Sequence, residues 1–141
     1  MYTNHRFSET NSLSPGIHLL TLGEIEKKLC FNKHRKALFK KCKKGIKNLM
    51  AAGVTDIYID GSFVSDKESP EDIDGCWAPA SFVNFTKIDP AFFNRKKMKT
   101  KYGVDFFLAN DTEGGSGKTF LEFFQRDRDG NPKGIIKIKL E

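Results

Sequence analysis

Two aspartates separated by one residue are the first feature of this sequence that can do chemistry. In Asp72-Ile73-Asp74, the first and third side chains of a strand point to the same face, about 7 Å apart, and Ile73 points the other way. Two negative charges held this close repel each other unless a cation lies between them. The pair therefore indicates a metal site.

A third carboxylate lies in the most strongly strand-like run of the chain. Asp105 is the one charged residue in a run of Val, Phe and Leu at 104–108. A charged group in such a strand must be hydrogen-bonded, paired or bound to a metal. Oxygen donors from adjacent strands suit Mg²⁺ or Mn²⁺, so we expect Asp72, Asp74 and Asp105 to bind one of these ions together.

A Gly-Ser pair follows an earlier strand-like run. Residues 55–60 alternate in the manner of a strand, and the run ends at Gly61 and Ser62. Backbone N–H groups and a hydroxyl at such a turn can hold a phosphate, especially at a helix N-terminus.

The order of these motifs resembles the signature of the polymerase-beta-like nucleotidyltransferase superfamily, which includes the minimal nucleotidyltransferases. The chain is more similar still to an uncharacterised prokaryotic family of small nucleotidyltransferase-like proteins. The similarity covers roughly residues 14–140. It rests on Ser14-Pro15-Gly16-Ile17, Thr21-Leu22-Gly23-Glu24-Ile25, Asp60-Gly61-Ser62-Phe63-Val64, Pro70-Glu71-Asp72-Ile73-Asp74, Phe123-Phe124-Gln125-Arg126-Asp127 and Lys133-Gly134-Ile135.

The resemblance implies a metal-dependent transfer of a nucleoside monophosphate from a nucleoside triphosphate to a hydroxyl. Gly61 and Ser62 would grip the triphosphate. Asp72 and Asp74 would bind two metal ions, and Asp105 would hold one of them and help to deprotonate the acceptor. Two ions can clamp the attacking and leaving oxygens of an in-line displacement.

The resemblance also suggests further partners. Lys67 and Lys118 are candidates for neutralising the triphosphate. The acceptor hydroxyl would belong to a protein, an RNA or a small molecule. Minimal nucleotidyltransferases often belong to two-gene toxin–antitoxin or defence pairs, so a regulatory role is implied as well.

One segment departs from the superfamily pattern. After Asp74 the superfamily usually continues with an apolar strand, whereas this chain continues Gly75-Cys76-Trp77-Ala78-Pro79. We therefore expect a short or bent strand here. The chain also shows no obvious second domain for a base or an acceptor, so the fold can persist without catalysis.

Basic residues dominate one predicted helix and give the second functional hypothesis. The net charge is +6, and the excess is local. The first cluster, at 33–47, contains Lys33, Arg35, Lys36, Lys40, Lys41, Lys43, Lys44 and Lys47, and a second contains Arg95, Lys96, Lys97, Lys99 and Lys101. Such clusters favour nucleic acid or an acidic partner. The alternative function is thus a catalytically inactive module that binds a protein or nucleic acid through the basic helix at 33–47. The simpler interpretation is that these lysines form an ordinary solvated helix face.

The order of helix and strand patterns predicts an α/β (α+β) fold with a mixed β-sheet. The resemblance implies that this sheet is nucleotidyltransferase-like, with helices mainly on one face. The predicted helices span 21–29, about 33–52 with Gly53 as the C-cap, and about 90–98. The predicted strands span 55–60, 72–77, 104–109 and 134–140, and the apolar segment 119–125 suits either a helix or a strand.

Length and composition predict one domain at 14–141 preceded by a flexible arm at 1–13. Neither an apolar signal-peptide core nor a run long enough for a membrane span is present, so no membrane is expected. Cys30, Cys42 and Cys76 have no paired spacing, which favours a reducing cytoplasm.

Two further motifs imitate ligand-binding loops. Residues 114–119 read Gly-Gly-Ser-Gly-Lys-Thr, but the phosphate-binding loop pattern needs a glycine where Thr112 stands. A mobile loop near the active site is the favoured interpretation, and a true phosphate-binding loop is the alternative. Residues 127–131 resemble a calcium loop, yet the required twelfth-position Glu is Ile138, so we expect a tight turn.

Overall fold

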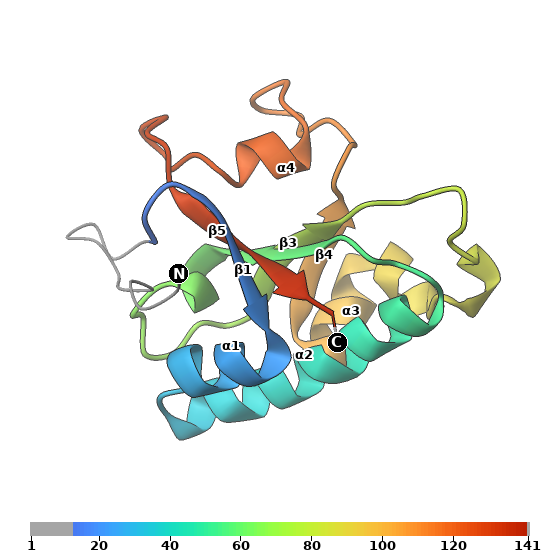
Figure 1. Ribbon diagram of the computed structural model, residues 1–141, viewed down its shortest axis with the longest axis horizontal. Coiled ribbons are helices and arrows are strands. Elements are labelled where there is room, and N and C mark those ends of the chain that lie inside the picture. The colour runs from blue at the N-terminus through green and yellow to red at the C-terminus, as the bar shows by residue number, and fades with distance from the viewer. Residues whose placement is uncertain (1–12, 141) are drawn as a thin grey trace.

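A mixed β-sheet organises residues 13–140, which the computed structural model describes (Figure 1). Within these residues five strands pair in the order β1-β5-β2-β3-β4. Their bounds are β1 Gly16–Thr21, β2 Ile57–Asp60, β3 Ile73–Trp77, β4 Val104–Leu108 and β5 Gly134–Lys139. The pairs β1–β5 and β3–β4 are parallel, whereas β2 is antiparallel to both β3 and β5. The predicted α+β class with a mixed sheet is confirmed.

Helices cover the two faces of this sheet unequally. The longer ones, α1 (Leu22–Leu29), α2 (Lys33–Ala51) and α3 (Arg95–Tyr102), lie on one side, and the short α4 (Phe120–Phe123) lies on the other (Figure 1). Short 3-10 helices η2 (Gly61–Val64), η3 (Phe85–Lys87) and η4 (Pro90–Phe93) occupy the connections. The expectation that helices pack mainly on one face is therefore met.

Local capping explains where the first two helices begin. Thr21 and Glu24 form the predicted capping box, in which each side chain accepts a hydrogen bond from the other residue's backbone N–H. Asn32 caps α2 by accepting from the backbone N–H of Arg35. Such a cap stabilises a helix by about 1 kcal/mol.

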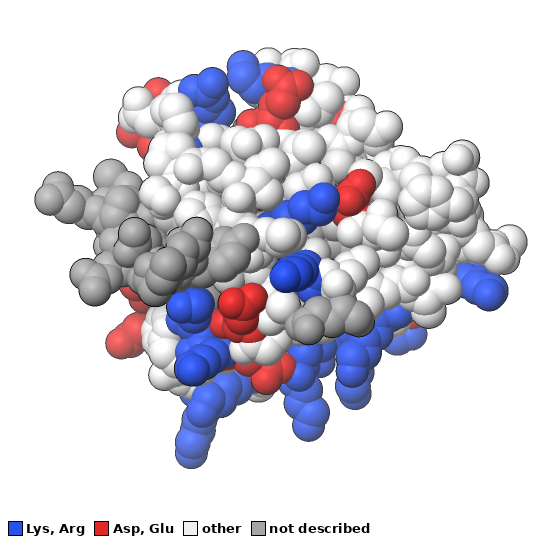
Figure 2. Space-filling model, viewed as in Figure 1, with Lys and Arg blue, Asp and Glu red and all other residues white. Residues whose placement is uncertain are grey.

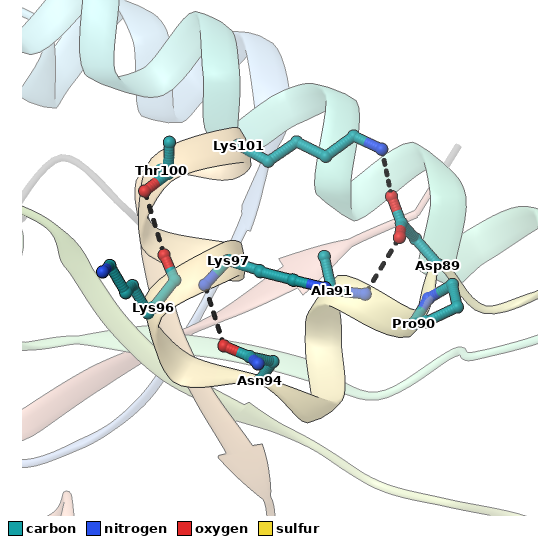
Figure 3. Close-up of a pocket in the computed structure, with 8 residues that line it drawn as sticks. All are labelled: Asp89, Pro90, Ala91, Asn94, Lys96, Lys97, Thr100 and Lys101. Atoms are coloured by element: carbon teal, nitrogen blue, oxygen red, sulfur yellow. Dashed lines mark hydrogen bonds and ion pairs between the residues drawn. The ribbon is translucent and has the colours of Figure 1, made fainter.

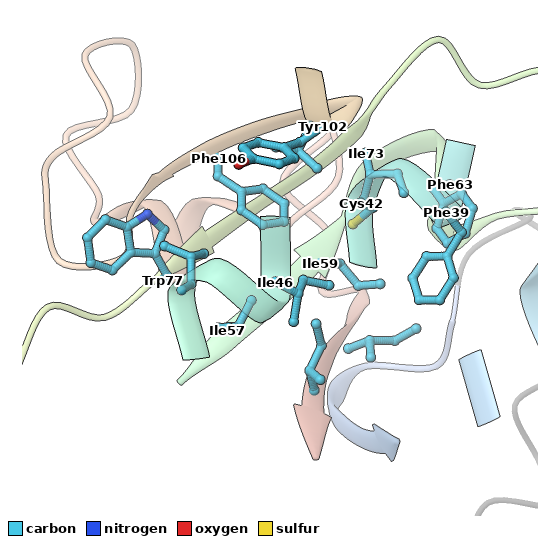
Figure 4. Packing of buried hydrophobic residues seen from close by; sticks show 14 of the residues in the cluster. Phe39, Cys42, Ile46, Ile57, Ile59, Phe63, Ile73, Trp77, Tyr102 and Phe106 are labelled. Atoms are coloured by element: carbon cyan, nitrogen blue, oxygen red, sulfur yellow. The ribbon is translucent and has the colours of Figure 1, made fainter. Parts of the chain in front are cut away.

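The main core fills the space between the sheet and α2 (Figure 4). Helix α2 contributes Leu38, Cys42, Ile46 and Leu49, at the three- and four-residue spacing of one helical face. Each fully buried Leu or Ile side chain contributes roughly 1.5–3 kcal/mol. This stripe therefore holds the helix on the sheet even though its other face is rich in lysine.

Alternate residues of β2 point to the two faces of the sheet. Ile57 and Ile59 of β2 belong to the main core, whereas Tyr58 joins a second, smaller cluster that includes Ile135. Phe120, Leu121 and Phe124 pack against that cluster. Asp60 continues the alternation of Tyr58, so its side chain lies on the α4 face.

Several sequence predictions need correction. Residues 16–21 form β1, which was not predicted, because its apolar stretch is short and pairs only with β5, distant in the sequence. The helix predicted at 90–98 is divided at Asn94, whose side chain caps α3 by accepting from the Lys97 backbone N–H. Strand β3, expected to be short or bent, has five residues and ends at Trp77, and its pairing with both neighbours is regular along that length.

The ends of the predicted elements also differ slightly. Residues 1–12 of the predicted arm lie outside the described residues. Leu13, the last residue of that arm, is buried, and its carbonyl accepts a hydrogen bond from Gly134, so it belongs to the folded domain. The ambiguous segment at 119–125 contains α4. No helix in the described part of the chain combines the length and apolarity needed to cross a bilayer.

Candidate metal centre

Three aspartates meet at one end of the sheet. Carboxylate oxygens of Asp72, Asp74 and Asp105 lie within 4.8 Å of one another. Asp74 and Asp105 are register partners of the parallel strands β3 and β4, and Asp72 stands just before β3. The convergence expected from the sequence is confirmed, and it places three hard oxygen donors where one divalent ion could bind them.

A fourth aspartate extends this row and was not predicted. Asp60, the last residue of β2, is the register partner of Asp74. It is buried, and Lys133 donates to both of its carboxylate oxygens, at 3.0 and 2.8 Å. Burial raises the pKa of Asp60, and the Lys133 ammonium opposes that shift. Asp60 therefore already has a cationic partner, and it is not one of the three clustered aspartates.

Asp74 carries the strongest electrostatic signature of the group. Burial, followed by the charges of Asp72, Asp105 and Asp60, raises the pKa of Asp74 to about 7. Burial disfavours the charged carboxylate of Asp74, and the three neighbouring negative charges add to that effect. Additional positive charge at this site would therefore stabilise the ionised form of Asp74.

Two cations of α3 already supply part of that charge. Arg95 donates to Asp105 through Nε and Nη2, and Lys99 Nζ lies 3.5 Å from Asp72 and 3.7 Å from Asp105. Residues four apart share one face of a helix, which explains why both reach the aspartates. Sequence reasoning assigned both to a general basic cluster, and only their spacing could have indicated a shared face.

Gly61 allows the strand-to-turn junction to approach the cluster closely. Its φ is +78°, and a Cβ at this position would overlap Oδ2 of Asp74. Only glycine is compatible with both constraints. The predicted Gly-Ser pair is therefore adjacent to the clustered aspartates, and it forms the first two residues of η2.

A buried arginine holds the loop that follows this turn. Arg35 is fully buried, and its guanidinium donates hydrogen bonds of 2.7–3.2 Å to backbone carbonyls. The acceptors are Leu29, Ser62, Phe63, Ser65 and Lys67. His34 and Asn32 also contact this loop, at the carbonyls of Pro70 and Glu68.

The position of Arg35 corrects the predicted basic surface of residues 33–47. Arg35 faces inward on the stripe of Leu38 and Cys42, which are three and seven residues further along the helix. Because that spacing is visible in the sequence, it could have indicated that Arg35 faces the core. The residue organises the connection between Ser62 and Asp72 and is not available to a partner.

The remaining predicted site residues, Ser62, Lys67 and Lys118, are not members of the aspartate cluster. Ser62 is half-buried, and its carbonyl accepts from Ser65 Oγ as well as from Arg35. The Lys67 side chain is exposed in the following turn, and no contact with the aspartates is present within residues 13–140. Lys118 lines a hollow together with Lys133, the partner of Asp60.

A hollow beside α3 lies apart from the three clustered aspartates. A cavity of about 800 Å³ is lined by Asp89, Asn94, Lys96 and Lys101, among others (Figure 3). Lys101 and Tyr102 both contact Asp89 there. None of the three clustered aspartates lines this cavity, so α3 presents Arg95 and Lys99 to one site and Lys96 and Lys101 to another.

Comparison with known proteins identifies the family. A family of unknown function (DUF6932) matches residues 5–139, and the chain therefore belongs to that family. No curated protein and no solved structure matches the chain.

Proposed function

We propose that this protein is a metal-dependent nucleotidyltransferase that transfers a nucleoside monophosphate from a nucleoside triphosphate to a hydroxyl acceptor. The observation that carries the proposal is the approach of Asp72, Asp74 and Asp105 to within 4.8 Å. The glycine at position 61, which packs against Asp74, supports it. Such an arrangement combines an ion site with a turn that can accept phosphate.

The three clustered aspartates are the residues that would hold Mg²⁺ or Mn²⁺, since both ions prefer oxygen ligands. When bound, the ion would supply positive charge that stabilises the oxygens of the phosphoryl group in transfer. Arg95 and Lys99 offer further positive charge to the same region. Because the side chain of Arg95 is 64% exposed, it can leave Asp105 and reach a phosphate.

The proposed reaction forms a bond between the acceptor oxygen and the α-phosphorus. The bond from that phosphorus to the pyrophosphate leaving group breaks at the same time. The hydroxyl proton passes to a carboxylate, which we assign to Asp105. Gly61 and Ser62 would hold the phosphate chain through backbone N–H groups and the Ser62 hydroxyl.

Calorimetric titration with each of the four nucleoside triphosphates tests the proposal. We expect binding in Mg²⁺ and much weaker binding in EDTA. Asp72→Asn should weaken the Mg²⁺-dependent binding by about tenfold or more, because it removes a charged ligand. Asp66→Asn is the matched control, since Asp66 is exposed in the same loop and is not part of the cluster.

Transfer itself is tested with nucleoside triphosphates labelled at the α-phosphate. Label should enter an acceptor of a cell extract, with release of pyrophosphate, in the wild type and in Asp66→Asn but not in Asp72→Asn. Absence of binding for all four nucleotides, or equal binding by Asp72→Asn and the wild type, would contradict the proposal.

A second candidate function rests on the outer face of α2. Lys36, Lys40, Lys44 and Lys47 are exposed there, and basic side chains project along the lower edge in Figure 2. A non-catalytic module could bind nucleic acid or an acidic protein through this face. Lack of nucleotide binding, together with salt-sensitive RNA affinity that Lys40→Glu and Lys44→Glu abolish, would favour this function.

We also propose a cytoplasmic location. Cys30, Cys42 and Cys76 are all unpaired and buried, which suits a reducing compartment. Membership of a toxin–antitoxin or defence pair stays a prediction of the resemblance, and identifying a labelled acceptor would test it.

A further inference from the structure

A cationic hollow lies beside α4, on the same face of the sheet as the aspartates. It has a volume of about 200 Å³, and its charged lining residues are Lys118, Glu122, Arg126 and Lys133. A second hollow of about 270 Å³ shares Lys118 and Arg126. We call the first cavity the α4 hollow. Its lining residues come from the start of β1, from α4 and the segments on either side of it, and from the segment just before β5, elements that Figure 1 labels.

The charges of the α4 hollow favour an anion. Three cations and one carboxylate line it, for a formal charge of +2 (3 − 1). Neither Lys118 nor Arg126 forms an ion pair anywhere in residues 13–140, and the Arg126 guanidinium donates only a 3.3 Å hydrogen bond to the Gly130 carbonyl. The Glu122 carboxylate is hydrogen-bonded to the Thr119 hydroxyl, from which its Oε1 accepts, and it does not pair with Lys118 or Arg126 in the described residues.

Lys133 connects the α4 hollow to the metal centre. Its Nζ binds both oxygens of Asp60, and Asp60 pairs in register with Asp74. The same lysine lines the hollow. Lys133 therefore contacts the neighbour of Asp74 on one side and lines the same hollow as Lys118 and Arg126 on the other.

Size and charge together limit the ligand. Pockets that enclose drug-sized organic molecules have volumes of about 300–1,000 Å³. The α4 hollow is smaller, so it suits phosphate groups rather than a whole nucleotide. Resting on the proposed function, we propose that Lys118 and Arg126 bind the β- and γ-phosphates of the nucleoside triphosphate in this hollow, beside Lys133.

Binding of inorganic tripolyphosphate tests this assignment without the metal reaction. Calorimetry in EDTA uses the full chain as wild type, as Lys118→Gln/Arg126→Gln, and as the control Lys96→Gln/Lys97→Gln. The control removes the same charge from the separate α3 cavity. All four side chains are exposed, so thermal unfolding should show that every variant remains folded.

We expect the Lys118/Arg126 double variant to lose at least about tenfold in tripolyphosphate affinity, because charge-assisted hydrogen bonds are the stronger class. The Lys96/Lys97 control should keep wild-type affinity. Equal losses in both double variants, or no binding by the wild type, would overturn the assignment, because only general electrostatic attraction would then be operating.

The failure of this inference is distinguishable from failure of the proposed function. If Mg²⁺-dependent triphosphate binding survives in Lys118→Gln/Arg126→Gln but is lost in Asp72→Asn, the hollow is wrongly assigned and the transferase proposal stands. If tripolyphosphate binding depends on Lys118 and Arg126 while no nucleotide binds, the hollow is supported as a phosphate site and the transferase proposal fails.

Discussion

Arg95 makes a bidentate contact with Asp105. Its Nε lies 3.0 Å from Oδ1, and its Nη2 lies 2.6 Å from Oδ2. The Asp105 side chain is only 7% exposed, whereas that of Arg95 is 64% exposed. An ion at the proposed site would therefore share this carboxylate with Arg95, which is the more exposed member of the pair. Replacing Arg95 should therefore change how strongly the stability of the protein depends on added metal.

Replacing Arg95 should make the protein more dependent on metal. Arg95→Met leaves the buried Asp105 carboxylate without its main partner, which should cost about 1–3 kcal/mol of metal-free stability. Mg²⁺ or Mn²⁺ should restore more stability to this variant than it adds to the wild type. Thermal unfolding in EDTA and in millimolar metal measures both effects.

Lys101→Met is the control for that comparison. Lys101 also pairs with a carboxylate, Asp89, and it belongs to the same helix, but it lies outside the metal centre. Its replacement should leave the metal response unchanged. Identical metal responses in the Arg95 and Lys101 variants would show that Arg95 does not compete with an ion.

Protonation of Asp74 should govern metal-free stability between about pH 4 and pH 7. The pKa is raised from the ordinary 3.8 to about 7 in the folded protein. Because the folded state holds the proton more tightly, stability is higher at low pH and falls as pH rises from 4 toward 7, after which the effect is constant. This group therefore opposes folding most strongly above pH 7.

Asp74→Asn removes that cost, and under the proposed function it should also weaken metal binding. In EDTA at pH 8, we expect a gain of roughly 2–6 °C in Tm, as for a stabilisation of about 1–2 kcal/mol in a chain of this size. The gain should disappear near pH 4. Asp111→Asn, at an exposed position, should show no such trend. A gain that is independent of pH would refute the role of Asp74.

The close contact at Gly61 can be separated from ordinary backbone strain. Gly61 and Gly130 have similar φ values, +78° and +82°, but only a Cβ at position 61 meets another side chain, that of Asp74. Gly130→Ala should cost about 1–2 kcal/mol from its left-handed backbone alone. Gly61→Ala should cost about 1–3 kcal/mol more because of the overlap, and should also weaken metal binding.

Urea unfolding and metal titration of these two alanine variants provide the comparison. Equal costs in both, with metal affinity retained in Gly61→Ala, would mean that Asp74 moves aside freely and that the turn does not fix its position.

Arg35 should be essential for the loop between the Gly-Ser turn and the aspartates. Arg35→Met leaves several backbone carbonyls without their donor, which should cost about 3 kcal/mol or more. Limited trypsin digestion should then cut faster after Lys67, whose carbonyl Arg35 normally holds. Lys36→Met, at the exposed neighbouring position, should change neither quantity. Unchanged cleavage in Arg35→Met would show that the loop is ordered by other contacts.

Local patterns in the sequence were sufficient for part of the fold and site. The capping box at Thr21 and Glu24, the apolar stripe of α2 and the meeting of Asp72, Asp74 and Asp105 could all be predicted. Each depends on spacing along one segment or on the simple rule that neighbouring strands align. The order of motifs also made the mixed sheet predictable.

Tertiary structure alone decided which distant groups become partners. The β1–β5 pairing, the contact of Lys133 with Asp60 and the hydrogen bonds from Arg35 to the loop carbonyls each join residues that no local period connects. Arg95 and Lys99 share a helical face by spacing, but only packing determines that this face meets the aspartates. The physical reason is that periodicity fixes which side chains share a surface, whereas the packing of the whole core selects the surface they meet.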